Sequence, residues 1–262
     1  MELLEAITSL FERAARPGLL GAPGKAIERT CRADLLAYFD KLSTAVDNAD
    51  LGKAMASDTK EHALHSVDMS LHNVLRKSST DLLQVLALNI QAGFLLGIKQ
   101  DVFHEASISG VFGNSDSIGP TAIDAAAYAA ERSAALVTEI NDTTRQLIRD
   151  AVERGFLEQL SPVQVARMIR ALMSEMTAYR SKMIARTEMA DAISEASMRK
   201  MQASGIQYKQ VILSDDACPI CADNADEDPL PIDELYSSGD LRAPFHPNCR
   251  CATTAARPPE GE

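Results

Sequence analysis

Two cysteine-rich segments near the C-terminus constrain the fold of this chain more than any other feature of its sequence. The first segment, CPIC, and the second, HPNCRC, together supply five candidate metal ligands: Cys218, Cys221, His246, Cys249 and Cys251. A tetrahedral zinc ion takes four thiolate or imidazole ligands, which usually come as two close pairs from segments that meet in space. The spacing therefore predicts a structural zinc site that closes residues 222–245 into a small lobe.

The second segment offers three candidates for two ligand positions, so two ligand sets are open. If Cys249 and Cys251 bind the ion, His246 is left beside the site or acts as a separate functional group. If His246 and Cys249 bind the ion, Cys251 is spare.

Three other uses of these residues are also open. Disulfides between the two segments would form only after the protein had left a reducing compartment. A catalytic pair of Cys249 and His246 lacks a nearby acid to orient the imidazole and lacks an oxyanion hole. A redox-active CPIC lacks the βαβ context of thioredoxin-like proteins.

The backbone around the candidate ligands is stiff, and the loop between them is acidic. Pro219, Pro244 and Pro247 restrict the chain, which lowers the entropy that is lost when the site closes. The loop has few core-forming residues and many carboxylates: Asp223, Asp226, Glu227, Asp228, Asp233, Glu234 and Asp240. A segment of this composition cannot fold through its own burial, so ligands at both ends would explain how it is held.

The rest of the chain has the composition of helices packed on helices. Aromatic residues make up only 5% of the sequence and tryptophan is absent, which disfavours a sandwich or barrel. Apolar side chains at helical spacing predict helices over residues 1–16, about 26–45 and about 58–77. Ser79, Thr80 and Asp81 are expected to cap a further apolar helix. The lone Cys31 is expected in the core.

A loop over residues 109–119, rich in Gly, Ser, Asn and Asp, is the main boundary in the sequence. The region before it, residues 1–119, is predicted to be helical, and its role is unassigned. The region after it, residues 120–262, begins with a long helix. Pro120 suits the first turn of this helix and Gly155 suits its C-terminal cap.

A second helix start follows, with Ser161 as N-cap and Gln164 three residues later. The buried side of this helix is predicted to consist of Val163, Val165, Ala166, Ile169 and Leu172. A third helix, over about 178–203, leads to the only convincing strand in the sequence, residues 206–213.

The predicted fold is therefore mainly α, a long-helix bundle with a small C-terminal α+β lobe. In the C-terminal domain the helices occupy residues 120–203 and the strand follows. The Cys/His lobe spans residues 214–254, and residues 255–262 are predicted to be a loose tail.

Charge and the N-terminus disfavour several functions. The formal net charge of −11 argues against a protein that coats DNA and leaves basic protein surfaces as partners. Local DNA contacts stay open at two basic stretches: Arg76 with Lys77, and Arg180 with Lys182 and Arg186. The N-terminus lacks a positively charged region followed by a cleavage site, so no signal peptide is expected. A cytoplasmic origin favours metal binding over disulfides.

Two further features have plain structural explanations. The apolar stretch over residues 82–98 is expected to be a buried helix, because a membrane span needs about 20 apolar residues and polar residues interrupt this stretch. His62, His65 and His72 have no HExxH-type zinc motif around them, so a surface or packing role is expected.

The segment IARTE, residues 184–188, places a charged residue on the apolar side of the third helix. Arg186 shares a face with Met189 and Ile193, so a buried guanidinium there would need a carboxylate or carbonyl acceptor. Arg186 and Glu188 are two positions apart and cannot pair with each other. The alternative is an exposed Arg and Glu on a solvated helix.

The combination of long helices, ARTE, CPIC and HPNCRC resembles the phage Mu F-like family of head morphogenesis proteins, also called minor head or minor capsid proteins. The resemblance covers roughly residues 120–254. The residues that match the ARTE, CPxC and HPxCRC elements of the family are Arg186, Thr187, Glu188, Cys218, Pro219, Cys221, His246, Pro247, Cys249, Arg250 and Cys251. Relatives usually follow CPxC with a Leu-Asp-Gly turn, whereas this chain has ADNADEDPLPI, which puts the shape of the loop in doubt.

The resemblance implies a structural protein of the phage head, with no enzymatic activity, that assembles in the host cytoplasm and ends in the virion. It implies the portal protein or the major capsid protein as partner, no membrane, and an influence on DNA packaging or delivery. Arg186 and Glu188 would be part of a structural motif. Two other functions stay open: a zinc-dependent enzyme or nucleic-acid-processing factor that uses His246, and an internal protein that contacts ejected DNA.

Overall fold

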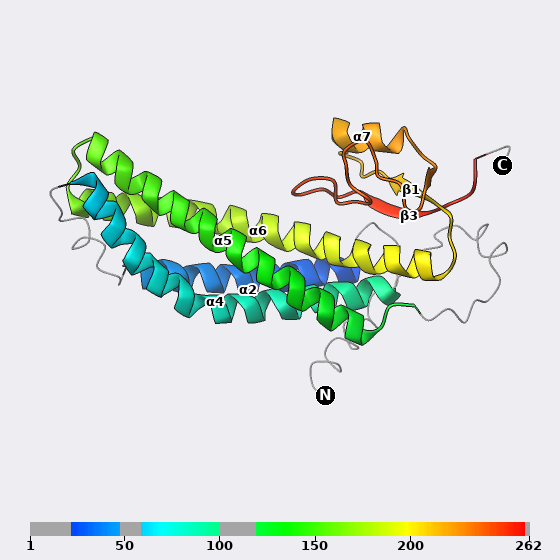
Figure 1. Ribbon diagram of the computed structural model, residues 1–262, viewed down its shortest axis with the longest axis horizontal. Coiled ribbons are helices and arrows are strands. Elements are labelled where there is room, and N and C mark those ends of the chain that lie inside the picture. The colour runs from blue at the N-terminus through cyan, green and yellow to red at the C-terminus, as the bar shows by residue number, and fades with distance from the viewer. Residues whose placement is uncertain (1–21, 48–58, 100–118, 260–262) are drawn as a thin grey trace. The chain divides into compact units, whose positions relative to one another are not determined.

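The computed structural model describes residues 22–47, 59–99 and 119–259. Most of these residues lie in long helices (Figure 1): α2 (Ala22–Asp47), α4 (Lys60–Lys99), α5 (Ala122–Leu157) and α6 (Pro162–Ala203). A small three-stranded sheet and a short helix follow α6. The prediction of a mainly helical chain with a small α+β part is confirmed. The helix predicted over residues 1–16 and all but the last residue of the loop predicted over 109–119 lie outside the described residues.

Helix α4 continues through the position where the sequence predicts a new helix start. Ser79 does not cap a helix, because its Oγ donates a hydrogen bond to Leu75 O at 2.6 Å within α4. The buried side chains of Leu75 and Leu82 carry one apolar stripe past this point. The predicted caps at Ser79, Thr80 and Asp81 are therefore wrong. A serine can bind a carbonyl of its own helix as readily as it caps the next one.

The apolar stretch predicted to be a buried helix forms the second half of α4. Its length and hydropathy would also suit a membrane span, a test that core helices of soluble proteins pass too, and 44% of the apolar window is buried. Leu82, Leu86, Ile90 and Phe94 are each 0% exposed. This burial favours the prediction of a core helix.

The turn between α5 and α6 confirms one predicted signal and corrects another. Ser161 N donates to Gln164 Oε1 at 2.8 Å, and Gln164 N lies 3.4 Å from Ser161 Oγ, the reciprocal contacts of a capping box. Gly155 is not the cap of α5, because the helix continues past it and the backbone turns at Gln159, where φ is 53°. A Cβ at Gly155 would lie 2.3 Å from Val165 Cγ2, so glycine permits the close approach of the two helices.

The start of α5 differs from the prediction by two residues. Pro120 precedes the helix, and Thr121 caps it. Thr121 N donates to Asp124 Oδ2 at 2.7 Å, and Asp124 N lies 3.4 Å from Thr121 Oγ1. The proline is therefore outside the first turn, because the capping box next to it sets the start.

Helix α6 joins two predicted helices into one. Thr177 Oγ1 donates to Met173 O at 2.6 Å, so this polar residue is satisfied inside the helix and does not break it. Val165 and Ile169 are buried as predicted, but Val163 is 65% exposed. The prediction for Val163 is wrong because the buried stripe of α6 begins after its capping box.

The described chain forms two compact units, each assembled from segments that are distant in sequence. The described residues of the helical unit are 31–47, 59–87 and 130–182, and its Cys31 is fully buried as predicted. The described residues of the lobe unit are 22–30, 88–99, 119–129 and 183–259, and they include all five candidate ligands.

Within the lobe unit, α4 and α6 approach each other closely at two glycines. A Cβ on Gly97 would lie 2.3 Å from Ile193 O, and a Cβ on Gly93 would lie 3.1 Å from Ala192 Cβ. Close packing of this kind leaves little freedom for either helix. This part of α6 is therefore a firm support for the residues that dock on it.

The strands form an antiparallel sheet in the order β2-β1-β3. The central strand is β1 (Tyr208–Ile212), and its neighbours are β2 (Leu230–Pro231) and β3 (Ala252–Ala256). Strands β1 and β3 run side by side along their whole length (Figure 1), from Tyr208 opposite Ala256 to Ile212 opposite Ala252. Only β1 is predicted from the sequence.

The predicted loose tail is wrong for its first two residues. Ala255 and Ala256 lie in β3 and are 1% and 3% exposed. Alanine carries little strand signal by itself, since strand preference depends on packing against neighbours. Pairing with β1 therefore decides the conformation here.

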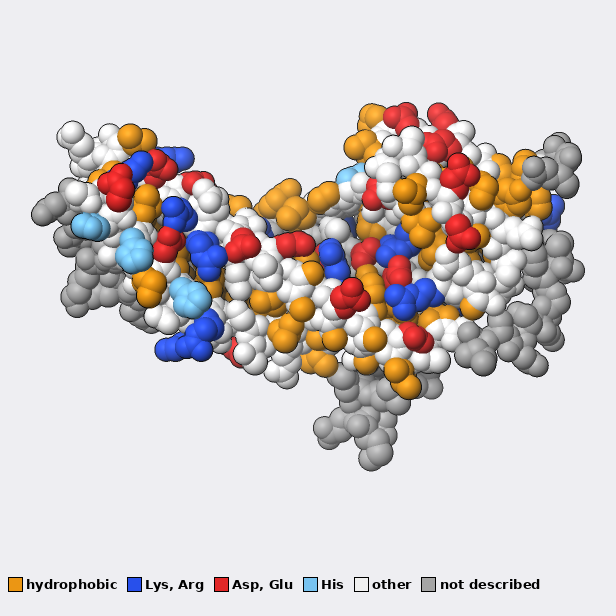
Figure 2. Space-filling model, viewed as in Figure 1, with side chains coloured by type: hydrophobic (Ala, Val, Ile, Leu, Met, Phe, Trp, Pro, Cys, Tyr) orange, Lys and Arg blue, Asp and Glu red, His pale blue; other side chains and the backbone are white. Residues whose placement is uncertain are grey.

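The acidic loop contains more core than its composition indicates. Tyr236 is 2% exposed and packs edge-on against Phe245, with ring centroids 5.3 Å apart. Ile232 joins a second cluster with Met198 and Met201. Carboxylates gather on the surface around the short helix α7 (Pro219–Ala225), as Figure 2 shows. Burial therefore holds this loop in addition to any ligands at its ends.

Candidate metal centre

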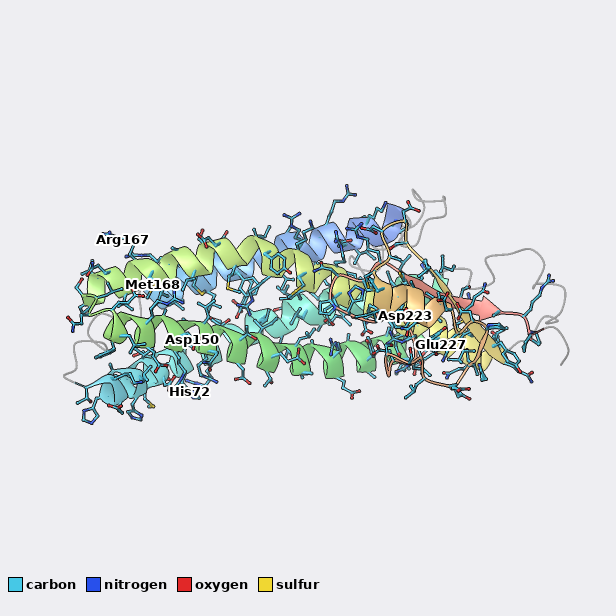
Figure 3. The ribbon with its side chains drawn as sticks, turned by 90° about the horizontal axis from the view of Figure 1, so that it is seen from above. His72, Asp150, Arg167, Met168, Asp223 and Glu227 are labelled. Carbon is cyan, nitrogen blue, oxygen red and sulfur yellow. The ribbon has the colours of Figure 1, made fainter. Side chains whose placement is uncertain are left out.

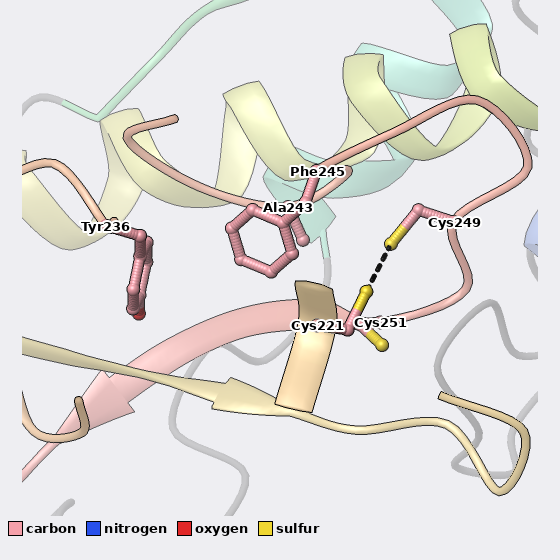
Figure 4. Packing of buried hydrophobic residues seen from close by; sticks show 6 residues of the cluster. All are labelled: Cys221, Tyr236, Ala243, Phe245, Cys249 and Cys251. Atoms are coloured by element: carbon pink, nitrogen blue, oxygen red, sulfur yellow. Dashed lines mark hydrogen bonds between the residues drawn. The ribbon is translucent and has the colours of Figure 1, made fainter. Parts of the chain in front are cut away.

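The five predicted ligands come together around Cys221. Two groups of side chains are placed to hold a metal ion: Cys218 with Cys221 and His246, and Cys221 with Cys249 and Cys251. His246 Nε2 lies 3.2 Å from Cys218 Sγ and 3.3 Å from Cys221 Sγ. Cys221 Sγ lies 3.7 Å from Cys218 Sγ and 3.7 Å from Cys249 Sγ, the contact drawn in Figure 4. All the cysteines are free thiols.

Local backbone structure explains how the first pair forms. Cys218 is the N-cap of α7, and Pro219 occupies the first turn, where a missing N–H costs nothing. Cys221 follows three residues later on the same side of the helix. The CPIC sequence therefore brings both thiols together through one helical turn.

The second segment is shaped by a tight turn. Cys249 N donates to His246 O at 3.1 Å, and Asn248 has φ of 64° in the left-handed region, which Asn tolerates better than most residues. The turn brings the imidazole of His246 to 3.3 Å and the thiol of Cys249 to 3.7 Å from Cys221 Sγ. Cys251 stands directly before β3.

The imidazole of His246 has one nitrogen directed at the thiols. Its Nδ1 lies 2.8 Å from Pro247 O, and a carbonyl oxygen can only accept, so Nδ1 carries the proton. This leaves the lone pair on Nε2, the atom that faces Cys218 and Cys221. An outer hydrogen bond that fixes the tautomer is typical of histidine ligands.

The thiols have different electrostatic surroundings. Burial raises the pKa of the Cys221 thiol well above its usual value, and the neighbouring Cys249 thiol adds to this shift. Burial also raises the pKa of Cys249. The pKa of Cys218 is lowered, chiefly by a backbone hydrogen bond from Cys221. The buried thiols are thus protonated at neutral pH unless a cation draws off their protons.

The donor types and part of the geometry fit a zinc ion, with the five donors arranged as two groups of three that share Cys221. With zinc–sulfur bonds of about 2.3 Å, two sulfur ligands of a tetrahedral site lie about 3.8 Å apart. The separations of 3.7 Å between Cys221 and its two neighbouring thiols agree with that spacing. Three soft ligands and one imidazole also match the Cys₃His type of structural site.

Apolar side chains surround the thiols. Cys221, Cys249 and Cys251 form one buried cluster with Tyr236, Ala243 and Phe245 (Figure 4). An apolar shell excludes water from the ligands and lowers the local dielectric. Such surroundings suit a structural site better than one that must admit substrate.

The ARTE and HPNCRC motifs meet in the lobe unit. Asn248 N donates a hydrogen bond to Thr187 Oγ1 at 3.0 Å, which joins residues that are 61 positions apart in the sequence. Arg186 Nε lies 3.3 Å from Glu28 Oε1, with both side chains less than one-fifth exposed, so its guanidinium has the carboxylate that a buried position requires. Glu188 is 4% exposed. Glu188 is therefore buried, and Arg186 is partly buried and paired rather than fully solvated.

A charged cluster that was not predicted from the sequence lies beside this junction. The Arg242 side chain is 13% exposed, and its Nη1 and Nη2 each lie 2.8 Å from a carboxylate oxygen of α6, those of Asp191 and Glu195. The Tyr128 hydroxyl donates to Asp191 as well. Asp191, Glu195 and Arg199 recur at four-residue spacing in the sequence. That spacing is a signal that could have indicated a polar contact face on α6.

Other candidate residues lie apart from the cluster. His62, His65 and His72 are exposed, and Figure 3 shows His72 directed outward from α4. Arg180 is 6% exposed, and its Nη1 lies 3.2 Å from Thr144 Oγ1. Neither Arg180 nor the paired Arg186 is available to contact DNA, which corrects that expectation for these two residues.

Comparison with known proteins identifies one family. Residues 142–254 match the family described as Phage Mu protein F like protein. The matched region contains the ARTE segment and both ligand segments, so the resemblance inferred from these motifs is confirmed. Neither the curated proteins nor the solved structures gave a match to the chain.

Proposed function

We propose that this protein, Phage Mu F-like over residues 142–254, is a minor head protein that acts structurally during assembly of the phage head. The family supports a role in head morphogenesis, capsid-related partners and a place in the virion. The finer proposal is that the protein docks on the portal protein or on the inner surface of the capsid, and thereby affects DNA packaging or delivery.

The junction of the two motifs is the observation that carries this proposal. Thr187 of ARTE and Asn248 of HPNCRC share a hydrogen bond of 3.0 Å, so the matched region is one built unit rather than two unrelated sequence elements. The cluster beside it consists of thiols and one imidazole in an apolar shell. Thiols and an imidazole in an apolar shell suit a site that holds a lobe together better than one that must admit a substrate.

Within this proposal the lobe binds one structural zinc ion through Cys218, Cys221, His246 and Cys249. The short distances from His246 Nε2 to two thiols support its place in the ligand set. Cys251, which lies 3.8 Å from Ser214 Oγ, is then the spare thiol of the cluster. The resident ion would fix the two segments and leave no coordination position for substrate.

The alternatives have less support. An enzyme that uses His246 needs an imidazole free to exchange protons, whereas both ring nitrogens face the cluster or its own turn. A DNA-contacting protein needs available cations, and Arg180 and Arg186 are buried or paired. Within the two basic stretches, Arg76, Lys77 and Lys182 are exposed.

Co-purification tests the function. The chain is produced together with the portal and major capsid proteins of its own phage, and procapsids are isolated by sedimentation. We expect a few copies per particle, retained after a salt wash and recovered with isolated portal. Complete exclusion from assembled particles would refute the proposal, and copies bound only to capsid shells that lack portal would refute portal docking.

Metal analysis tests the zinc site and its ligands. Protein purified under reducing conditions should contain about one zinc per chain, as four-ligand structural sites do. Cys221→Ser should lose the metal, whereas Cys251→Ser and the control Cys31→Ala, which removes a thiol outside the cluster, should retain it. Loss of zinc from Cys251→Ser with retention in His246→Ala would favour the other ligand set.

A further inference from the structure

Three residues of α6 form a polar stripe along one side of the helix. Thr187, Asp191 and Glu195 follow one another at four-residue spacing, which puts them on a common face. All three contact the segment that runs from Arg242 to Cys249, and this segment carries two of the proposed zinc ligands. We call Thr187, Asp191 and Glu195 the α6 polar stripe.

Arg242 joins one end of the segment to this stripe. Its Nη1 lies 2.8 Å from Asp191 Oδ1, and its Nε and Nη2 lie 3.0 Å and 2.8 Å from Glu195 Oε2. The side chain is 13% exposed, so these contacts are shielded from water. Charge-assisted bonds with this geometry fix direction as well as distance.

Thr187 joins the other end. Its Oγ1 accepts from Asn248 N at 3.0 Å, and Asn248 lies between His246 and Cys249 in the turn that those two residues close. The left-handed conformation of Asn248 points its N–H toward the helix. The position of this single amide therefore sets how the imidazole and the thiol face each other.

We propose that the α6 polar stripe positions the second ligand segment for metal binding, with Thr187 and Arg242 as positioning residues; this inference rests on the proposed zinc site. Without the threonine hydroxyl, the Asn248 amide loses its acceptor and the turn loses its anchor. His246 and Cys249 then sample other orientations, and ordering them on binding lowers the affinity for the ion. The coupling is reciprocal, so bound zinc stabilises the contacts on α6.

Zinc affinity of matched Thr187 variants tests the proposal. Thr187→Val removes the hydroxyl at nearly constant volume, Thr187→Ser retains it, and Thr143→Val is the control. Thr143 is an exposed helical threonine whose Oγ1 binds a carbonyl of its own helix. In competition with a chromophoric chelator under reducing conditions, Thr187→Val should bind zinc about 10- to 100-fold more weakly than the native chain. Thr187→Ser and Thr143→Val should stay within a few-fold of it.

Hydrogen exchange of the native chain, with and without zinc, is a second test that does not depend on any variant folding. Zinc should increase protection at residues 242–249 and also at residues 187–195 of α6. The positioning role would be overturned, with the zinc site left intact, by either of two results. One is equal zinc affinity of Thr187→Val and the native chain, and the other is hydrogen exchange at residues 187–195 that is the same with and without zinc. A native chain that binds no zinc would overturn both.

Discussion

Lys209 is a lysine in the central strand whose ammonium group is completely buried. Its Nζ donates to Ile232 O at 3.0 Å and to Glu234 O, and it lies 5.2 Å from the centre of the Tyr236 ring. Burial lowers the pKa of Lys209 to about 8, although nearby carboxylates oppose the shift. This one side chain ties the acidic loop to β1 through backbone carbonyls.

The lowered pKa of Lys209 predicts a specific pH dependence of stability. The unfolded chain holds this proton up to a pH of about 10.4 and the folded chain only to about 8, so the unfolded state binds more protons between these values. Stability relative to Lys209→Met should therefore rise from pH 8 to pH 10, by on the order of 2 kcal/mol. Urea unfolding of both chains at each pH measures this difference. A difference in unfolding free energy that does not change with pH would show that Lys209 has the same pKa in the folded and unfolded chains.

The cluster of candidate ligands could be predicted from the sequence, but the residues that support it could not. Cys218 and Cys221 stand out because their spacing is a local property of one helical turn. The burial of Lys209 and Arg242 depends on segments that meet only in the folded chain, and an isolated Lys or Arg in a sequence is most often exposed. The proposal that His246 is a ligand rests on its distances to Cys218 and Cys221, since spacing allows it either inside or outside the ligand set.

At the scale of elements, the crossing of α4 and α6 depends on the absence of a side chain. Gly97 faces Ile193 O at a separation where a Cβ would lie only 2.3 Å away. The obstructing atom is backbone, so it cannot rotate aside as a flexible side chain would. The two helices would have to move apart to accommodate even one methyl group.

Gly97→Ala is therefore expected to destabilise the protein, despite the better helix propensity of alanine. Overpacking of this kind costs about 1–3 kcal/mol. The control is Gly119→Ala, where an added Cβ would meet nothing within 4 Å. Thermal unfolding should show a lower Tm for Gly97→Ala and little change for the control. A neutral Gly97→Ala would mean that the crossing relaxes freely.

The elements themselves were predictable to different degrees. The capping box at Ser161 is a local signal, and it is confirmed. The break expected at Ser79 is absent, because polar side chains inside a long helix can bind its own carbonyls. Strand β3 was not predicted, because its alanines become a strand only through pairing with β1. Sequence signals such as capping boxes therefore predict an element correctly when contacts between residues near each other in the sequence decide its structure.

At the scale of the whole molecule, each compact unit draws on segments from both halves of the sequence. The helical unit joins Cys31–Ala87 to Ala130–Lys182. The predicted boundary at residue 119 separates the chain into two consecutive regions, whereas each compact unit combines segments from before and after it. The family match begins later, at residue 142. The sequence does not show which segments of the long helices pack together, because their apolar stripes are similar. The separate roles of residues 1–119 and 120–262 stay a prediction.

Metal removal should affect the two units unequally. The helical unit contains none of the five ligands among its described residues, and its core consists of helix side chains. After chelation we expect new proteolytic cleavage within residues 214–254, with most of the far-UV helical signal retained. A zinc-reconstituted sample is the control. Cooperative loss of the entire helical signal would show that the ion stabilises both units.

The strand order also sets a sequence of events during synthesis. Strand β1 occupies the centre of the sheet, yet the ribosome makes it before both of its neighbours. Strand β2 lies inside the acidic loop and pairs only with Tyr208 and Lys209, so the other edge of β1 stays unpaired until β3 has been made. An unpaired edge of this kind can pair wrongly with another strand.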